Sequence, residues 1–189
     1  GKHNILNALA AASVGHVFRM AAAQIAEALR TVEAPAQRGQ VINFDKGFTV
    51  INDSYNSNPA ALMSMVETLV EGGLAAKRKI VVAGEMLELG RDEAEIHRRL
   101  GRDIARSGVD MLIGVRGLAR QLVEGAQDFG FDNAVFSEDS ESAGMLLVGK
   151  LQEGDVVLIK GSRGVKTERV LEKLLEKFEL EKGISGGAA

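Results

Sequence analysis

The feature that most constrains this chain is the alternation of short β-branched runs with helical patterns from Gln40 onward. Strands are expected at 41–44, 48–52, 79–83, 111–115, 134–136 and 156–159, and helices at 59–70, 92–106, 118–129, 140–150 and 166–178. Runs such as Ile80-Val81-Val82 are apolar on both faces, which is typical of parallel strands covered on both sides. The pattern therefore predicts an α/β fold with a mostly parallel sheet and helices on both faces.

The amino-terminal part is expected to differ from this plan. The first two strands are too close for a helical crossover, so they should form an antiparallel hairpin that turns near Asp45-Lys46-Gly47. Residues 1–35 contain a helical pair and no strand. Two helices cannot bury an apolar face alone, so this pair is expected to belong to a further domain. The Gly-rich tail, 183–189, is expected to be disordered.

Composition narrows the class of protein. The 189 residues are 46% hydrophobic and carry a net charge of -3 with Lys and Arg spread along the chain, so a nucleic-acid partner is not expected. No apolar run approaches the roughly 20 residues that span a bilayer, so no membrane partner is expected. The absence of Cys removes disulfides and thiolate metal sites. We expect a soluble, cytoplasmic protein.

Ligands of open α/β sheets collect at the carboxyl ends of the strands, and three loops at such positions are polar. In the first, 52–59, Asp53 could accept hydrogen bonds from a sugar or meet a metal, while Asn58-Pro59 starts a helix. A simple turn and helix cap explains this loop equally well. In the second, 84–90, Glu85 and Glu88 could form a paired-carboxylate site, but a partly packed loop with solvated Glu side chains is favoured.

The third loop is the strongest candidate for binding a ligand. Lys160-Gly161-Ser162-Arg163-Gly164 places two cations, a hydroxyl and two glycines between a strand and a helix. Cations at a helix amino end oppose the helix dipole, so a bound anion explains them better than stability does. The chain holds no Gly-x-x-x-x-Gly-Lys-Ser/Thr loop, and the turn 114–117 lacks the third glycine of a dinucleotide fingerprint. No spacing of the His residues suggests a metal site, and His97 alone within a helix is more often structural.

Four segments in order resemble motifs of the Mur ligase family in its MurF form. They are Gly1–Ala11, Ile51–Pro59, Gly84–Gly90 with His97 following, and Lys160–Arg163 with Glu168 following. The resemblance implies that residues 1–35 are the helical end of a central ATPase domain and that 36–182 form a Rossmann-like carboxyl-terminal domain. It implies an ATP-dependent ligase that joins D-alanyl-D-alanine to UDP-N-acetylmuramoyl tripeptide with Mg²⁺, the metal ligands lying mostly in the central domain.

The resemblance also assigns site residues. The expected nucleotide-binding residues are His3, Asn4, Asn7, Arg38, Asp53 and Asn56. Lys160 and Arg163 are the expected catalytic residues, and Ser162, Glu85 and His97 the expected substrate-binding residues. Three positions depart from the family pattern: Gln37-Arg38-Gly39 replaces Pro-Gly-Arg, Asn52 replaces an Asp, and Glu85 replaces an Asp.

Alternatives remain open at this point. Other Mur-type ligases and folylpolyglutamate synthase share this layout, although the Asp-Asn-Pro-Arg motif of MurE is absent. A stand-alone nucleotide-binding module and a non-catalytic domain on a ligase scaffold are further options. Because the phosphate-binding loop is absent, the 189 residues alone are not expected to hydrolyse ATP or to ligate.

Overall fold

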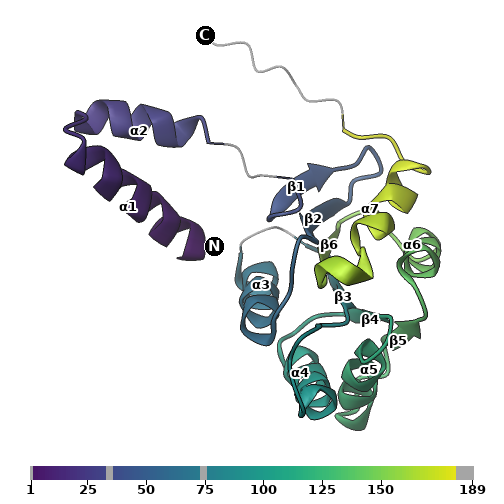
Figure 1. The fold of residues 1–189 in the computed structure, drawn as a ribbon. Helices are drawn as coiled ribbons and strands as arrows, with labels where there is room; N and C mark the ends of the chain where they lie inside the picture. Colours follow the sequence, from purple (N-terminus) through teal and green to yellow (C-terminus); the bar gives the residue numbers. More distant parts are fainter. Residues whose placement is uncertain (1, 33–35, 73–75, 182–189) are drawn as a thin grey trace. The chain divides into compact units, whose positions relative to one another are not determined.

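The computed structural model describes residues 2–32, 36–72 and 76–181, and the predicted disordered tail lies outside them. The chain divides into two compact units, Gly1–Pro35 and Ala36–Ala189. Figure 1 shows the helices and strands of each unit.

The first unit is the predicted helical pair. It consists of α1 (Lys2–Val17) and α2 (Ala22–Arg30). Gly15 lies where the two helices approach each other, since a Cβ there would meet the side chain of Ile25 at 3.0 Å. Apolar side chains such as Leu6, Leu9 and Val14 are more than half exposed, and α2 contains no buried residue. The pair therefore has no core of its own.

The second unit is built on one six-stranded sheet, with strands in the order β1-β2-β6-β3-β4-β5. The strands are β1 (Gln40–Asn43), β2 (Thr49–Asp53), β3 (Arg78–Gly84), β4 (Met111–Val115), β5 (Ala134–Ser137) and β6 (Asp155–Lys160). Only the β1–β2 pair is antiparallel, and its turn uses Gly47 at a φ of 76°. The predicted fold class and hairpin are confirmed.

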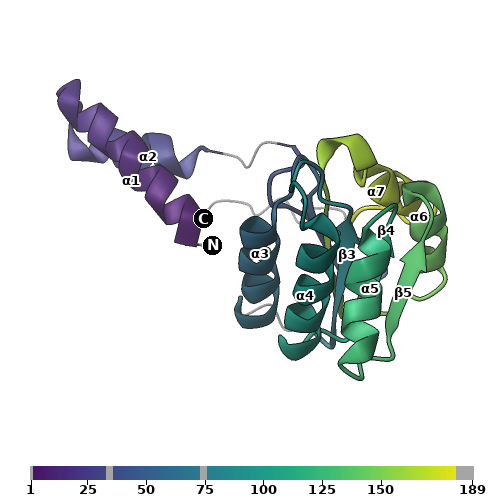
Figure 2. The same cartoon turned by 60° about the horizontal axis from the view of Figure 1, so that its bottom comes forward.

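Helices cover both faces of this sheet (Figure 2). One face carries α3 (Pro59–Glu71), α4 (Glu93–Arg106) and α5 (Ala119–Asp128), and the other carries α6 (Ser140–Val148) and α7 (Glu168–Leu175). The predicted start of α3 is confirmed, because the Asn58 side chain accepts the N–H of Ala61 at 2.8 Å and Pro59 is the first helical residue.

The last predicted helix differs from the structure in two respects. A short 3₁₀ turn at Arg163–Val165 and a left-handed Lys166, with φ of 58°, come first, so α7 begins only at Glu168. The helical spacing over 166–178 predicts a buried Leu175, but Leu175 is 45% exposed because α7 ends there. Phe178 packs beyond the helix end instead, with its ring 5.1 Å from that of Phe48.

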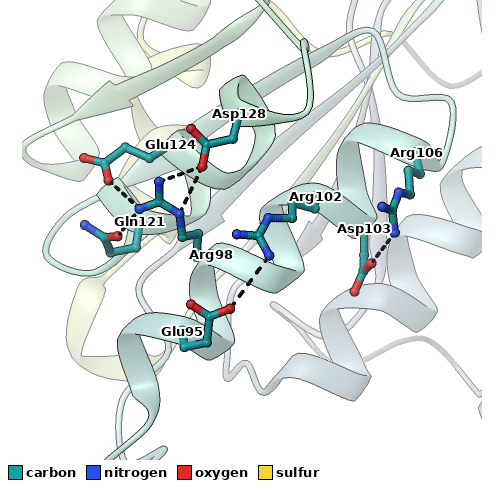
Figure 3. A network of polar contacts seen from close by, with 8 residues as sticks. All are labelled: Glu95, Arg98, Arg102, Asp103, Arg106, Gln121, Glu124 and Asp128. Atoms are coloured by element: carbon teal, nitrogen blue, oxygen red, sulfur yellow. Dashed lines mark hydrogen bonds and ion pairs between the residues drawn. The ribbon is translucent and has the colours of Figure 1, made fainter.

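Helices α4 and α5 pack unusually closely. A Cβ on Gly101 would overlap the carbonyl oxygen of Leu122, and one on Gly125 would overlap that of Arg98. Above this contact Arg98 bridges the helices, with hydrogen bonds to Asp128, Gln121 and Glu124 (Figure 3). The Asp128 carboxylate raises the pKa of Arg98 above its usual value. Glycine thus sets the helix spacing, and charged groups line its solvent side.

Within the described residues, no helix combines the length and the apolar character required to cross a membrane.

Candidate active site

The site begins at the adjacent carboxyl ends of β2 and β6. Asp53 ends β2 and lies opposite Lys160, which ends β6. The Lys160 ammonium lies 2.5 Å from Oδ2 of Asp53 and donates to the carbonyl oxygen of Asn56 at 2.8 Å. Lys160 is buried, so its charge is paired with Asp53 inside the protein. Lys160, which the resemblance predicts to be catalytic, is here a buried cation that holds Asp53 and the loop after it.

Ser162 joins all three loops that the sequence singled out. Its hydroxyl accepts the N–H of Leu87 at 3.0 Å and donates to the carbonyl oxygen of Ser57 at 3.5 Å. Its own N–H donates to the carbonyl oxygen of Glu85 at 3.3 Å. Ser162 is itself buried, so its side chain joins the loops inside the protein and is not placed to contact a ligand.

Glu85 and His97, both predicted to bind substrate, are likewise used within the protein. A Glu85 carboxylate oxygen accepts the N–H of Leu118 at 2.9 Å, at the start of α5. His97 is fully buried; its Nε2 accepts the N–H of Met86 at 3.0 Å, and Nδ1 donates to the carbonyl oxygen of Glu93 at 2.6 Å. Both ring nitrogens are therefore hydrogen-bonded within the protein, and a role of His97 in binding substrate stays a prediction. The packed-loop interpretation of 84–90 holds for buried Met86 and for exposed Glu88, whereas Glu85 is half-buried and hydrogen-bonded to the start of α5.

A cluster of exposed residues stands at the same edge of the sheet. The Arg38 guanidinium lies 4.1 Å from the centre of the Tyr55 ring, and that of Arg163 lies 5.6 Å from it. Arg163 also donates to the side-chain oxygen of Gln37 at 2.8 Å. Asn56 is exposed as well, and its side-chain oxygen accepts the N–H of Ser57 at 2.9 Å. Arg38 and Arg163 are thus cations that remain accessible to an anionic ligand.

A cavity of about 640 Å³ adjoins this cluster beyond Gly164. Its charged lining residues are Arg116, Glu138, Asp139, Glu141, Lys166 and Arg169. Arg116 donates to the carbonyl oxygen of Gly164 at 2.8 Å, and Arg169 pairs with Glu141 at 2.8 Å. The backbone N–H of Ser142 donates to the Asp139 carboxylate and lowers its pKa. The cavity therefore offers both signs of charge.

Sequence reasoning missed this cavity. The only signals were Asp139 after the fifth predicted strand and Arg116 in a turn dismissed as a weak dinucleotide match. Both follow strands at the carboxyl edge, as the three chosen loops do, and neither lies in a motif that the resemblance covered.

The described residues contain no group of three or more His, Asp or Glu side chains arranged to hold a metal ion. Asp53 already shares one oxygen with Lys160. The residues of this part of the chain therefore do not fit a complete Mg²⁺ site.

The three predicted nucleotide residues of the first unit all belong to α1. Asn7 is exposed, whereas the side chains of His3 and Asn4 lie outside the described part. The site above is thus built from the second unit alone.

Comparison with known proteins identifies the class. Residues 37–163 match the family model described as "Mur ligase, glutamate ligase domain", and this match covers more than half of the chain. The chain belongs to the Mur ligase family. Within that family it is similar to the UDP-N-acetylmuramoyl-tripeptide–D-alanyl-D-alanine ligase of Bacillus subtilis (strain 168), with 33% identity over 93% of the chain. The ligase of the same name from Mycobacterium tuberculosis (strain H37Rv) is 35% identical over 93% of the chain.

Solved structures give the same relationship. MurF from Acinetobacter baumannii superposes with a TM-score of 0.84 at 27% identity, covering 94% of this chain and 38% of that one. The MurF ligase of Thermotoga maritima in complex with ADP superposes with a TM-score of 0.72 at 26% identity, covering 87% and 36%. The resemblance to the MurF form of the family is confirmed. The chain spans 38% of the length of the B. subtilis and M. tuberculosis relatives.

Proposed function

We propose that this chain is the carboxyl-terminal part of an ATP-dependent amide ligase that joins D-alanyl-D-alanine to UDP-N-acetylmuramoyl tripeptide. One observation carries the proposal. The buried Lys160–Asp53 pair and the Ser162 hydroxyl fix three loops at one edge of the sheet, and they leave Arg38 and Arg163 exposed there. The reaction and the nucleotide are inferred from the relatives that bear the name of this ligase and from the MurF ligase of Thermotoga maritima in complex with ADP.

In this proposal the first loop receives the nucleotide. Lys160 holds Oδ2 of Asp53, so the carboxylate is fixed in place to accept a hydrogen bond from a ribose hydroxyl. Arg38 approaches the phosphates, and Asn56 lies beside the nucleotide. ATP supplies the phosphoryl group that activates the tripeptide carboxylate. The first unit belongs to the central ATPase domain, where His3, Asn4 and Asn7 approach the adenine and other residues hold Mg²⁺.

The cavity beside Gly164 is proposed to receive the dipeptide. A dipeptide carries an ammonium at one end and a carboxylate at the other, and charges of both signs line the cavity: Lys166 and the ion-paired Glu141 and Arg169. Arg163 precedes Gly164 of the cavity lining and contacts Tyr55 of the first loop, and in this proposal it stabilises negative charge that develops on oxygen during amide formation. We propose that the reaction takes place in the cytoplasm.

The test is a ligation assay on the full reading frame that contains these 189 residues, supplied with ATP, Mg²⁺, the tripeptide and D-alanyl-D-alanine. We expect release of ADP and phosphate together with a product whose mass is that of the tripeptide plus the dipeptide less one water. Arg163→Ala should lower kcat by at least about 100-fold, because it removes a fixed cation from the reacting oxygens. Ligation at wild-type rates with glutamate or diaminopimelate in place of the dipeptide would instead favour a different Mur-type ligase.

A further inference from the structure

The Arg38–Tyr55–Arg163 cluster assigns a role to a residue that the reaction chemistry leaves unused. Tyr55 is 44% exposed and follows Asp53 and Ser54 in the first loop, and its backbone N–H donates to the carbonyl oxygen of Gln37 at 3.1 Å. This hydrogen bond joins the first loop to the segment that carries Arg38. The Tyr55 ring therefore lies between two segments far apart in the sequence, one carrying Arg38 and the other Arg163.

The ring contacts bring two like charges together. With 4.1 Å and 5.6 Å from the ring centre to the two guanidinium carbons, Arg38 and Arg163 are at most about 10 Å apart. Two exposed cations at such a distance repel each other, and the negative face of an aromatic ring offsets part of that repulsion. The ring thus contacts both cations.

The neighbouring carboxylates do not cancel this charge. Asp53 is already paired with the buried Lys160. The Glu168 carboxylate is 3.9 Å from Arg163, at the outer limit of an ion pair, and among the described residues Arg38 has no carboxylate partner. Gln37 is neutral and orients Arg163 by accepting one of its N–H groups. The cluster therefore retains the positive charges of Arg38 and Arg163, which together suit an anion with more than one charged group.

We propose that Tyr55 is a positioning residue whose ring holds Arg38 and Arg163 as a paired receptor for the phosphate chain of the nucleotide. The inference rests on the proposed function for the identity of the phosphate compound, but its physical core is polyphosphate binding that depends on the ring and not on the phenol hydroxyl. Phe should replace Tyr55 without loss, whereas an aliphatic residue of similar bulk should not.

The experiment measures binding of inorganic tripolyphosphate by titration calorimetry to wild type, Tyr55→Phe and Tyr55→Leu, all made in the full reading frame. We expect the Phe variant to bind within about twofold of wild type and the Leu variant to bind about tenfold more weakly, with a shallower dependence on salt. Phe129→Leu is the matched control: it removes a ring that contacts Arg106 at 4.6 Å at the far ends of α4 and α5, and it should leave tripolyphosphate binding unchanged.

A double-mutant cycle then tests whether the ring acts through Arg38. The loss from Tyr55→Leu should shrink to less than about threefold in an Arg38→Leu background, because one of the cations that the ring holds is gone. In ligation assays Tyr55→Leu should raise the KM for ATP more than it lowers kcat.

Several results would overturn the inference: no tripolyphosphate binding by the wild type, equal binding by Tyr55→Leu, or a Phe variant as weak as the Leu variant. Ring-dependent tripolyphosphate binding in a protein without ligase activity would contradict the proposed function and support this inference. Normal ligation with the same KM for ATP in wild type and Tyr55→Leu would support the proposed function and contradict this inference.

Discussion

At the scale of single residues, the Lys160–Asp53 pair is the contact on which the site most depends. Lys160→Met should destabilise the fold by about 3 kcal/mol, because it leaves a carboxylate in a largely buried place without its cation. Urea unfolding followed by circular dichroism measures this change. Lys77→Met is the matched control, since the Lys77–Glu153 pair at 3.6 Å is well exposed and its loss should cost less than about 1 kcal/mol. Equal effects of the two substitutions would contradict the buried-pair interpretation.

Asp139 gives a prediction about pH at the same scale. The N–H of Ser142 donates to the Asp139 carboxylate and lowers its pKa below the ordinary value of 3.8. The folded state therefore binds this proton less readily than the unfolded state does, so the contribution of Asp139 to stability is present above pH 3.8 and is lost as the pH falls through the lowered pKa.

Asp139→Asn isolates that contribution, because Asn can cap α6 without titrating. The difference in the free energy of unfolding between wild type and Asp139→Asn should be constant from pH 7 to about pH 5 and shrink below it. A series of urea titrations across this range measures the difference. A gap that widens on acidification would mean that the sign assigned to the pKa shift is wrong.

At the scale of elements, the glycines between α4 and α5 decide how closely these helices pack. Gly→Ala usually stabilises a helix by about 1 kcal/mol. Gly125→Ala should instead destabilise by about 2 kcal/mol, because the added methyl group would overlap the backbone carbonyl of Arg98 and push the helices apart. Gly149→Ala is the control: its φ is -74° and the nearest atoms to an added Cβ are at 3.7 Å, so it should be neutral or slightly stabilising. Thermal unfolding of both variants distinguishes the two cases.

The helices and strands themselves could be predicted from the sequence, because the spacing of apolar residues and the short apolar runs indicate them directly. The stripe Leu62, Met65, Val66 and Leu69 is buried on α3 as its spacing requires. The pattern failed where the backbone departs from regular geometry. Nothing in the composition around Lys166 predicts a left-handed residue that delays the start of α7.

The site was predictable to the level of loops but not of side chains. The rule that ligands collect at carboxyl ends of strands selected 52–59, 84–90 and 160–164, and the structure brings all three together through Ser162. Which side chains face outward depends on tertiary contacts at long sequence separation, such as Lys160 with Asp53. A sequence pattern carries no information on those contacts, so the two cations of one motif could not be separated into the buried Lys160 and the exposed Arg163.

At the scale of the whole molecule, the last prediction concerns ATP hydrolysis and ADP binding by this chain alone. The 189 residues hold no Gly-x-x-x-x-Gly-Lys-Ser/Thr loop, and the described part offers no metal-binding group of acids. The proposed Arg38–Arg163 receptor therefore lacks the loop and the Mg²⁺ that phosphoryl transfer from ATP requires. The chain purified alone should therefore hydrolyse ATP no faster than a buffer blank, as measured by phosphate release. Its binding of ADP should be weak, with a Kd above about 100 μM, because in the proposed function the site is completed by another domain of the full protein. A matched measurement on Asp53→Ala tests whether that weak binding is specific, since loss of the ribose acceptor should lower it about tenfold further. Robust hydrolysis by the isolated chain would show that the catalytic machinery lies within these residues after all and would contradict the assignment of phosphoryl transfer to a separate domain.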